Sequence, residues 1–459
     1  MNHSARIDDG EKSLSTEKTQ PRKAGFYSWY VVIILMIAYT FSFIDRQILA
    51  LLVEPIKADL GFSDTQVSLL YGLAFAVFYT TLGLPIARLA DASNRRNLIA
   101  VGILLWSAMT AVCGMVRTFP GLFMARVGVG VGEAALSPAA YSMIGDYFPR
   151  HQLGRALSVY GTGIFVGAGL AIIIGGQVVS SVASSPDITL PFIGTIRPWQ
   201  LTFMIVGLPG VLITAVLLAT VREPVRLGRI SQNSSGAVPL SEAISFIRQH
   251  LRLFSGHFLS FGFISLSAYA MSSWTPTWLI RVQQWTPAEV AWKYGPIVLV
   301  FGTAGILTGG FISDRLLKKG RSDAPIITAL VAALLMIIPS GTATLSDNPT
   351  VFLPLICLAT LLLSVPFGIA VAALQMVTPN ELRALLGALY LFTINLLGLA
   401  VGPTAVAITT DYVFADPMAV GKSIALIAAI STSVAVVFYL LTLRPFRLAV
   451  ADNNVQIDS

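Results

Sequence analysis

The strongest constraint on this fold is a series of twelve apolar runs, each about as long as a membrane-spanning helix. A helix that crosses a bilayer needs roughly 20 mostly apolar residues. The length of the runs, and their content of Leu, Ala, Ile, Gly and Phe, favours helices over the short alternating strands of a membrane barrel. The runs lie near residues 29–53, 67–88, 98–116, 121–143, 156–179, 199–221, 253–280, 294–313, 324–345, 350–376, 384–410 and 423–443.

Composition supports the same interpretation. Only 12% of the 459 residues are charged, about half of the roughly 25% that an ordinary soluble domain carries. This excludes a simple soluble enzyme, a disordered protein and a nucleic-acid binder, despite a net charge of +7. The two cysteines, Cys113 and Cys357, both lie in apolar runs, which excludes a disulfide framework. The sequence therefore predicts an all-α integral membrane protein.

The positions of the basic residues predict how the chain is oriented, because cytoplasmic loops are enriched in Lys and Arg. Residues 1–24 are polar and of mixed charge, and we expect a disordered cytoplasmic tail rather than a signal peptide. With this tail inside, only six of the 30 basic residues fall on the opposite side: Lys57, Arg117, Arg197, Arg281, Lys293 and Lys422. We therefore expect a multi-pass protein of the cell membrane with both termini cytoplasmic.

The chain divides into two halves that repeat each other. A linker at 222–252, which contains a predicted amphipathic surface helix, separates a bundle at 25–221 from a bundle at 253–443, and a cytoplasmic tail follows at 444–459. Asp91 and Asp314 each end a run and precede a basic pair, at an offset of 223 residues, and 149–160 matches 379–390 at an offset of 230. Such internal duplication is a feature of many transporter folds.

These residues resemble the major facilitator superfamily of secondary transporters. The loop with Gly83, Asp91, Arg95 and Arg96 is similar to its loop between helices two and three, and Arg126, Gly130 and Glu133 are similar to its helix-four motif. More narrowly, the chain resembles the spinster subfamily in these positions: Phe43, Asp45, Arg46, Phe75, Tyr79, 84–87 and 132–134.

The resemblance implies two six-helix bundles that work by alternating access. It also implies an amphipathic lipid cargo, such as a lysophospholipid or sphingosine 1-phosphate, and proton coupling. We call the following residues the gate motif, since by resemblance they hold the closed cytoplasmic gate: Gly83, Asp91, Arg95, Arg96, Asp314 and Arg315. The alternative is that these residues do not form a gate and only keep the cytoplasmic loops solvated and anchored. The fifth helix lacks the Gly-Pro pair of the drug-antiporter motif, which argues against that branch.

Four ionisable residues lie well inside the runs: Asp45 and Arg46 in the first, and Arg126 and Glu133 in the fourth. A charge at mid-bilayer costs about 2.5–3.5 kcal/mol and is therefore expected to pair and to carry function. Arg126 and Glu133 share one helical face, about 10 Å apart along the axis, at depths that overlap that of Asp45. We expect a single charged cluster.

Within this cluster we expect Arg46 and Arg126 to bind an anionic headgroup, since arginine offers a planar fork of donors. Burial and a neighbouring arginine act in opposite directions on the pKa of a carboxyl. Glu133, with Asp45 as its partner, is therefore the predicted proton carrier. The alternative is a structural ion-pair network that holds the first and fourth helices together.

The second half has no charge inside its runs, so its cavity wall is expected to be largely apolar. The predicted polar or amphipathic lining residues are Tyr269, Trp274 and Asn395. Asn395 lies in the middle of a run without charges, where its amide needs a hydrogen-bond partner. A charged half facing an apolar half suits cargo with an ionic head and an apolar tail. The four histidines are dispersed and no Walker loop is present, so we predict neither a metal nor a cofactor.

Other functions remain as alternatives. The nearest is a proton-coupled multidrug or organic-anion exporter. A membrane lipid enzyme needs an interfacial nucleophile or a His–carboxylate set, which the sequence lacks. A receptor gives no reason for duplicated gate loops, and a channel does not fit charges confined to one half. We expect a monomer whose partners are the transported small molecule, protons and membrane lipids, with no nucleic acid.

Overall fold

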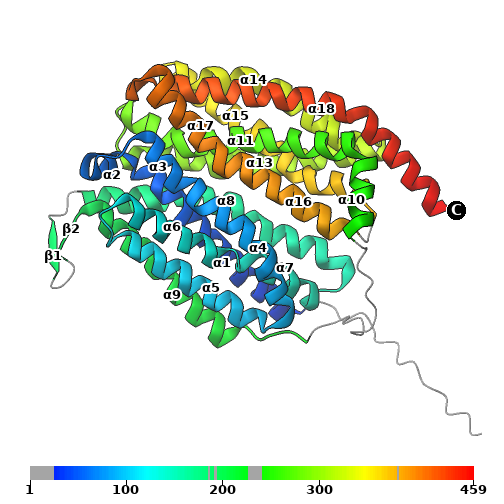
Figure 1. Ribbon diagram of the computed structural model, residues 1–459, viewed down its shortest axis with the longest axis horizontal. Coiled ribbons are helices and arrows are strands. Elements are labelled where there is room, and N and C mark those ends of the chain that lie inside the picture. Colours follow the sequence, from blue (N-terminus) through cyan, green and yellow to red (C-terminus); the bar gives the residue numbers. More distant parts are fainter. Residues whose placement is uncertain (1–24, 184–186, 191–193, 226–239, 380–381, 459) are drawn as a thin grey trace, which may run out of the picture.

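The structure is a computed structural model that describes residues 25–183, 187–190, 194–225, 240–379 and 382–458. It is almost entirely helical, and twelve of its helices are long and apolar enough to cross a membrane. The helices lie roughly along one axis in two bundles, one above the other in Figure 1. The predicted all-α, twelve-helix membrane fold is confirmed.

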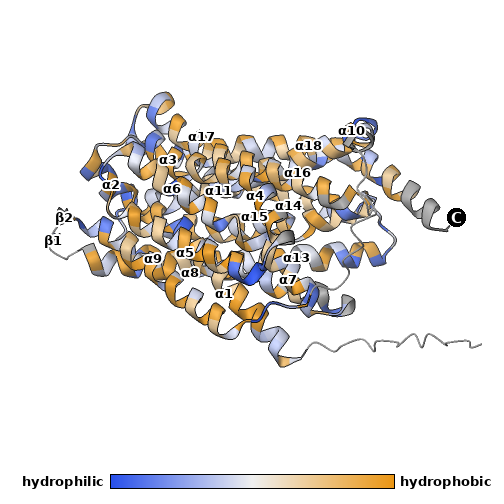
Figure 2. Cartoon of the chain, turned by 60° about the horizontal axis from the view of Figure 1, so that its bottom comes forward, coloured by the Kyte–Doolittle hydropathy of each residue, from blue (hydrophilic) through white to orange (hydrophobic). Residues whose placement is uncertain are grey.

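Both described ends of the chain lie at the same end of the molecule, which we call the terminal face; the opposite end is the far face (Figure 1). Hydrophobic residues cover the sides of the long helices, and hydrophilic residues gather mainly at the two ends (Figure 2). This distribution is the one that a bilayer requires of a spanning protein, because its hydrocarbon core offers polar groups no hydrogen-bond partner.

The first bundle contains six spans and a small far-face hairpin. Its elements are α1 (Phe26–Leu51), α2 (Val53–Leu60), α3 (Asp64–Tyr71), α4 (Leu73–Ala92), α5 (Arg95–Cys113), α6 (Phe119–Glu133), α7 (Leu136–Tyr147), α8 (Arg150–Ala183), β1 (Ile188–Leu190), β2 (Gly194–Ile196) and α9 (Pro198–Thr220). The antiparallel β1–β2 pair, which the sequence analysis did not predict, joins the fifth span to the sixth.

The second half of the chain begins with a short surface helix, α10, and continues with six spans. Its elements are α10 (Leu240–Gln249), α11 (Leu251–Arg281), α12 (Pro287–Glu289), η1 (Val290–Tyr294), α13 (Gly295–Lys318), α14 (Ala324–Thr342), η2 (Ala343–Leu345), α15 (Pro349–Met376), α16 (Arg383–Asn395), η4 (Leu396–Val401), α17 (Gly402–Ile408), η5 (Thr409–Phe414), η6 (Pro417–Ala419) and α18 (Val420–Asp458). The segments η1, η4 and η5 are π-helical turns, and η2 and η6 are 3₁₀ turns.

Several spans are interrupted where a proline follows. Proline has no N–H to donate to the carbonyl four residues earlier. Pro55 follows the break between α1 and α2, Pro138 follows the break between α6 and α7, and Pro403 follows the π turn η4. The freed carbonyl of Leu399 in η4 faces Gly72 of the first bundle, where a Cβ would lie only 2.4 Å from it. Glycine is required there for the close approach of the two backbones.

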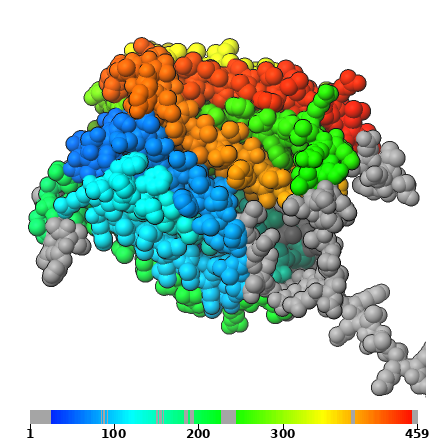
Figure 3. Space-filling view, in the orientation of Figure 1, coloured from blue at the N-terminus to red at the C-terminus, as the bar shows by residue number. Residues whose placement is uncertain are grey.

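The hydrophobic core shows how the two bundles meet. Toward the far face, one cluster of buried side chains draws on both bundles, from Ile44 and Trp199 to Trp278 and Ile424. Toward the terminal face, two further clusters are almost wholly separate, one in each bundle. Burial of apolar area is the main attraction between packed elements, so the bundles are held together chiefly at the far face. There the surfaces of α2 and α3, in blue, and of α17, in orange, meet in Figure 3.

Parts of the predicted linker and of the predicted tails lie outside the described residues. The predicted tail at 1–24 and residues 226–239 of the linker lie outside the described residues. The predicted amphipathic surface helix corresponds to α10 (Leu240–Gln249). The last predicted run ends at residue 443, whereas helix α18 continues to Asp458.

Candidate functional site

The structure brings the four predicted intramembrane charges into one buried cluster between the helices of the first bundle. Asp45 and Arg46 come from α1, Arg126 and Glu133 from α6, and each residue is at most 8% exposed. Arg46 Nε donates to Glu133 Oε2 at 2.6 Å, and Arg46 Nη2 contacts the same oxygen at 2.5 Å. The carboxyl of Asp45 lies within electrostatic range of the other three charges.

An aromatic box surrounds the guanidinium of Arg46. Its Cζ lies 4.8 Å from the ring centroid of Phe43, 4.5 Å from that of Phe75 and 4.9 Å from that of Tyr79. Rings at such distances attract a cation through their quadrupole. The box thus holds the guanidinium in place beside Glu133, whose second oxygen, Oε1, is buried without a hydrogen-bond partner in the described part of the chain.

Arg126 differs from Arg46 because no carboxylate binds it directly. It is fully buried, and its donors reach only backbone carbonyls: Nε reaches Leu70 O at 3.5 Å and Nη1 reaches Asp45 O at 3.2 Å. Its Nη2 has no partner among the described residues. A buried donor without a partner is costly, so Arg126 is not stabilised by its surroundings to the extent that Arg46 is.

The predicted lining residues of the second bundle take different positions. Tyr269 of α11 lies within electrostatic range of Arg46 and Glu133. Trp274 lies nearer the far face, where its indole N–H donates to Pro403 O at 2.9 Å in a narrow space that Tyr71 and Ser273 also line. Asn395 is partly exposed at the end of α16, immediately before the π turn η4. Of the three, Tyr269 is the one brought to the charges.

Among the described side chains of the gate motif, none forms a hydrogen bond or ion pair between the two bundles. Arg95 is buried within the first bundle, where Nη1 binds Asp146 at 2.5 Å and Nε binds Glu223 at 2.7 Å. The backbone N–H of Arg96 also donates to Glu223, at 3.0 Å. Asp314 and Arg315 are exposed and form no ion pair with a described residue. Gly83 lies in α4 with open space around it, and the side chain of Asp91 is outside the described set.

A second ionic cluster, which the sequence analysis missed, closes the far face; we call it the far-face latch. Arg281, at the end of α11, donates to both oxygens of the fully buried Asp64 at 2.7 and 2.8 Å and to Glu54 Oε1 at 2.7 Å. Lys57 also binds Asp64, at 2.5 Å. One cation of the second bundle is thus inserted among charges of the first.

Two further contacts accompany the latch. The backbone N–H and the hydroxyl of Thr65 each donate to Asp411 Oδ2 at 2.7 Å, and Thr277 donates to Ala50 O at 3.3 Å. Between described residues, all hydrogen bonds and ion pairs that join the bundles lie toward the far face. Arg281 is one of the six basic residues that the sequence places on the outer side. This position was the only sequence signal for a role of Arg281 in an ion pair at the far face.

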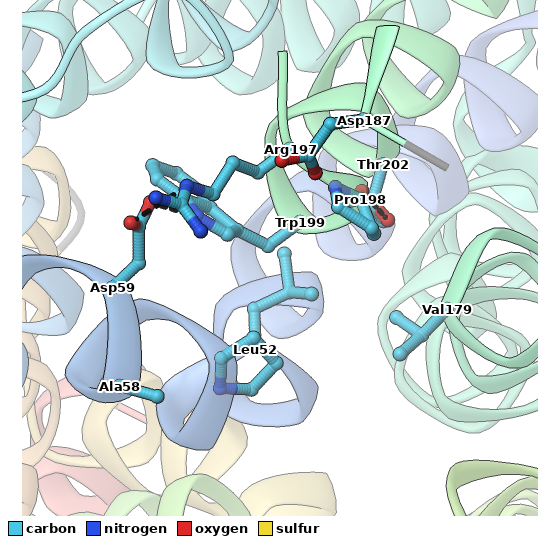
Figure 4. A pocket seen from close by; sticks show the side chains of 10 residues that line it. Leu52, Ala58, Asp59, Val179, Asp187, Arg197, Pro198, Trp199 and Thr202 are labelled. Carbon is cyan, nitrogen blue, oxygen red and sulfur yellow. Dashed lines mark hydrogen bonds and ion pairs between the residues drawn. The ribbon is translucent and has the colours of Figure 1, made fainter. Parts of the chain in front are cut away.

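A pocket of about 300 Å³ also lies at the far face, but it belongs to the first bundle alone. Figure 4 shows Asp59 of α2 paired with Arg197, whose Nε lies 2.8 Å from Asp59 Oδ1, beside Trp199, Val179 and Leu52. The indole N–H of Trp199 donates to Asp59 Oδ2 at 2.8 Å. Since Asp59 is satisfied by these two partners and the pocket is remote from the buried charges, it is not the candidate site.

Two six-helix bundles that pack together at one face, with buried charges in the first bundle, are the architecture of many membrane transporters. Comparison with known proteins agrees. Residues 35–403 match the Major Facilitator Superfamily, and the chain belongs to this family.

The relatives include spinster proteins. The chain is 27% identical over 438 residues to an MFS-type efflux pump of Mycolicibacterium smegmatis, covering 93% of this chain and 94% of that protein. It is 24% identical to Protein spinster of Drosophila melanogaster, over 68% of this chain and 50% of that protein. It is 27% identical to the probable L-galactonate transporter of Escherichia coli, over 71% and 72% of the two chains.

A solved structure has the same architecture. A bacterial homologue of the human lysosomal transporter Spinster, in an inward-facing and unoccupied conformation, superposes with a TM-score of 0.73 at 26% identity, covering 93% of this chain and 97% of that one. The fold and the relatives together identify a spinster-type member of the superfamily, as the sequence motifs predict.

Proposed function

We propose that this transporter moves an anionic amphipathic lipid, of the lysophospholipid or sphingoid-phosphate kind, by proton-coupled alternating access. The observation that carries the proposal is the buried cluster of Asp45, Arg46, Arg126 and Glu133. Charges inside a membrane protein are costly and mark substrate or proton pathways. In a purely structural network, Arg126 Nη2 and Glu133 Oε1 would both have hydrogen-bond partners. Among the described residues neither atom has one.

We further propose that the terminal face is cytoplasmic and that the structure is in an inward-facing state. The distribution of Lys and Arg supports this orientation. The separate cores at the terminal face and the shared core at the far face support this state. The similarity to a structure described as inward-facing agrees with it. The gate motif then joins the bundles only in the opposite state, when the cytoplasmic side closes.

Proton coupling follows from competition for the arginines. A proton that binds Glu133 neutralises the carboxylate and weakens its contact with Arg46, which frees the guanidinium for an oxyanion of the cargo. Asp45 and Arg126 form a second such pair without a direct side-chain contact. Loss of the proton restores the Arg46–Glu133 pair and releases the cargo. The two carboxyls therefore carry protons, and the two arginines bind the headgroup.

A lipid cargo is supported by the contrast between the two halves. The first bundle supplies the buried charges, whereas the second contributes an apolar surface with Tyr269 and Asn395 as its polar points. Cargo with an ionic head and an apolar tail fits both walls. The relatives named spinster are consistent with this class.

A second candidate is a proton-coupled exporter of small organic anions or drugs. The relatives named as a galactonate transporter and as an efflux pump favour it. Two arginines would serve a carboxylate as well as a phosphate. Under this candidate the apolar second wall has no specific use.

The two candidates are separated by transport into proteoliposomes that contain the purified protein. A panel of lysophospholipids and sphingosine 1-phosphate is compared with galactonate, with and without an imposed proton gradient. We expect lipid movement that the gradient accelerates. If galactonate moves under either condition and no lipid does, the second candidate holds and the lipid proposal fails.

A further inference from the structure

A column of aromatic rings leads from the charged cluster toward the terminal face. Beyond Phe43 of the aromatic box, Tyr39 packs at 5.4 Å between ring centroids. Tyr39 stacks in parallel on Tyr160 at 4.8 Å, and Tyr160 meets the edge of Tyr141 at 5.4 Å. Tyr141 is 46% exposed. Three helices of the first bundle, α1, α7 and α8, thus build one continuous surface from Arg46 to an accessible ring.

The hydroxyl groups of these tyrosines interact electrostatically through that of Tyr79. The hydroxyl of Tyr79 lies within electrostatic range of those of Tyr39, Tyr141, Tyr160 and Tyr269. Tyr269 comes from the second bundle, so the group bridges the interface between the bundles. Four of these phenols, those of Tyr39, Tyr79, Tyr160 and Tyr269, also lie within electrostatic range of Arg46. Packing does not require their hydroxyls, because phenylalanine would fill the same volume.

Most of these hydroxyls are unused by the fold. Tyr160 shares a hydrogen bond with Ser137 at 3.3 Å. Those of Tyr39, Tyr79, Tyr141 and Tyr269 have no hydrogen-bond partner within the described parts of the chain. Buried or half-buried tyrosines usually find a partner for the O–H. Elsewhere in the same bundle this is so, since Tyr71 donates to Gln47 and Tyr30 to Thr220.

Arg46 also has N–H donors that no described residue uses. Its two contacts with Glu133 use Nε and Nη2 and end on a single oxygen, and its Nη1 has no partner among the described residues. A guanidinium has five N–H donors. Free N–H and O–H donors around one point, with aromatic faces as walls, match an oxyanion attached to an apolar body.

We propose that the hydroxyls of Tyr39, Tyr79 and Tyr269, together with Arg46, form the oxyanion-binding site for the cargo. This rests on the proposed function and extends it, because it assigns recognition of the headgroup to neutral phenols as well as to the arginines. The oxyanion is a phosphate or a carboxylate. Tyr160 and Tyr141 continue the surface toward the terminal face and line the route by which the headgroup leaves.

The test is binding of defined probes to the purified full-length protein in nanodiscs. The probes are lysophosphatidate, a fatty acid, the neutral monoacylglycerol of the same chain length, and galactonate. The variants are Tyr39→Phe and Tyr79→Phe, which remove only the hydroxyl. Tyr390→Phe is the matched control, since Tyr390 is buried in the second bundle beside His257 and Phe261, away from Arg46. Thermal unfolding of each variant checks that it is folded.

A hydrogen bond to a charged group is worth enough that each of the two substitutions should weaken binding of the oxyanion about tenfold or more. Binding of monoacylglycerol should be unchanged, and Tyr390→Phe should bind all probes like the wild type. The proposal is overturned if both variants keep wild-type affinity for the oxyanion. It is also overturned if they lose affinity for the charged and neutral lipids equally.

The source of the oxyanion follows from the probes. Stronger effects on lysophosphatidate than on the fatty acid assign a phosphate, and the reverse assigns a carboxylate. If the wild type binds galactonate and no lipid, the lipid-transport proposal fails, and the tyrosine site is then judged by the same variants with galactonate. If the wild type binds none of the oxyanions, both proposals fail.

Discussion

The far-face latch makes a sharp prediction about the conformational equilibrium. In Arg281→Gln the fully buried Asp64 loses both of its guanidinium contacts, at 2.7 and 2.8 Å. Removing one partner of a buried ion pair costs about 3–5 kcal/mol. The additional contact with Glu54 contributes little, because that side chain is 37% exposed and solvent screens it.

The cost falls on the state in which the far face is closed, because water reaches Asp64 once the bundles separate there. A loss of about 3 kcal/mol changes the ratio of the two states more than a hundredfold. We therefore expect Arg281→Gln to shift the population toward the state that is open at the far face. Lys57, which remains beside Asp64 at 2.5 Å, places the effect at the lower end of the range.

The shift can be measured with a single introduced cysteine. Ser273→Cys places the thiol in the narrow space between the bundles, where Ser273 is 3% exposed, in a background of Cys113→Ala and Cys357→Ala. A membrane-impermeant thiol reagent added from the far side should label this position much faster in Arg281→Gln than with the latch intact. Arg197→Gln is the control, because Arg197 pairs with Asp59 inside the first bundle. Equal labelling rates in all three proteins would refute the latch.

Two further predictions concern packing and the terminal face. Gly72→Ala places a Cβ 2.4 Å from Leu399 O, so the bundles must part there and the same labelling assay should report a more open far face; an unchanged rate argues against the close approach. Arg95→Ala leaves Asp146 and Glu223 without their buried partner and should cost about 3 kcal/mol, which lowers the midpoint of thermal unfolding by several degrees. Lys293→Ala removes an exposed pair with Glu289 and a contact of the same ammonium with the ring of Trp285 at 4.6 Å. Because the Lys293 side chain is about half exposed, this variant should lower the midpoint much less. Equal midpoints for the two variants would contradict the assigned role of Arg95.

Much of the fold was predictable because a membrane constrains a sequence strongly. Each span must be long and apolar, so the twelve runs correspond to the twelve spans, with ends that differ by several residues. The clustering of Asp45, Arg46, Arg126 and Glu133 was predictable as well, because charges in a bilayer must pair or face water. The rise of a helix per residue is enough to predict that these residues lie at similar depths in the membrane.

Contacts between the bundles could not be predicted in the same way. Arg281 and Asp64 are separated by 217 residues, and their meeting depends on how two whole bundles approach each other. The π turn η4 and the closeness of Gly72 to Leu399 depend on the same approach. The partners of Arg95, Asp146 and Glu223, were also not predicted, because they lie 51 and 128 residues away along the chain. The tyrosines near Arg46 were missed because Tyr39, Tyr79, Tyr160 and Tyr269 lie on four different helices without a common spacing.

Transport under an imposed pH gradient, by proteoliposomes that contain Glu133→Gln or Asp45→Asn, tests the central claim most directly. If the intramembrane carboxyls couple proton binding to cargo binding at the arginines, transport by these variants loses its dependence on the gradient, while exchange of cargo without a gradient persists. If both variants show the pH dependence of the wild type, the charged cluster is a structural ion-pair network, and the account of coupling is wrong.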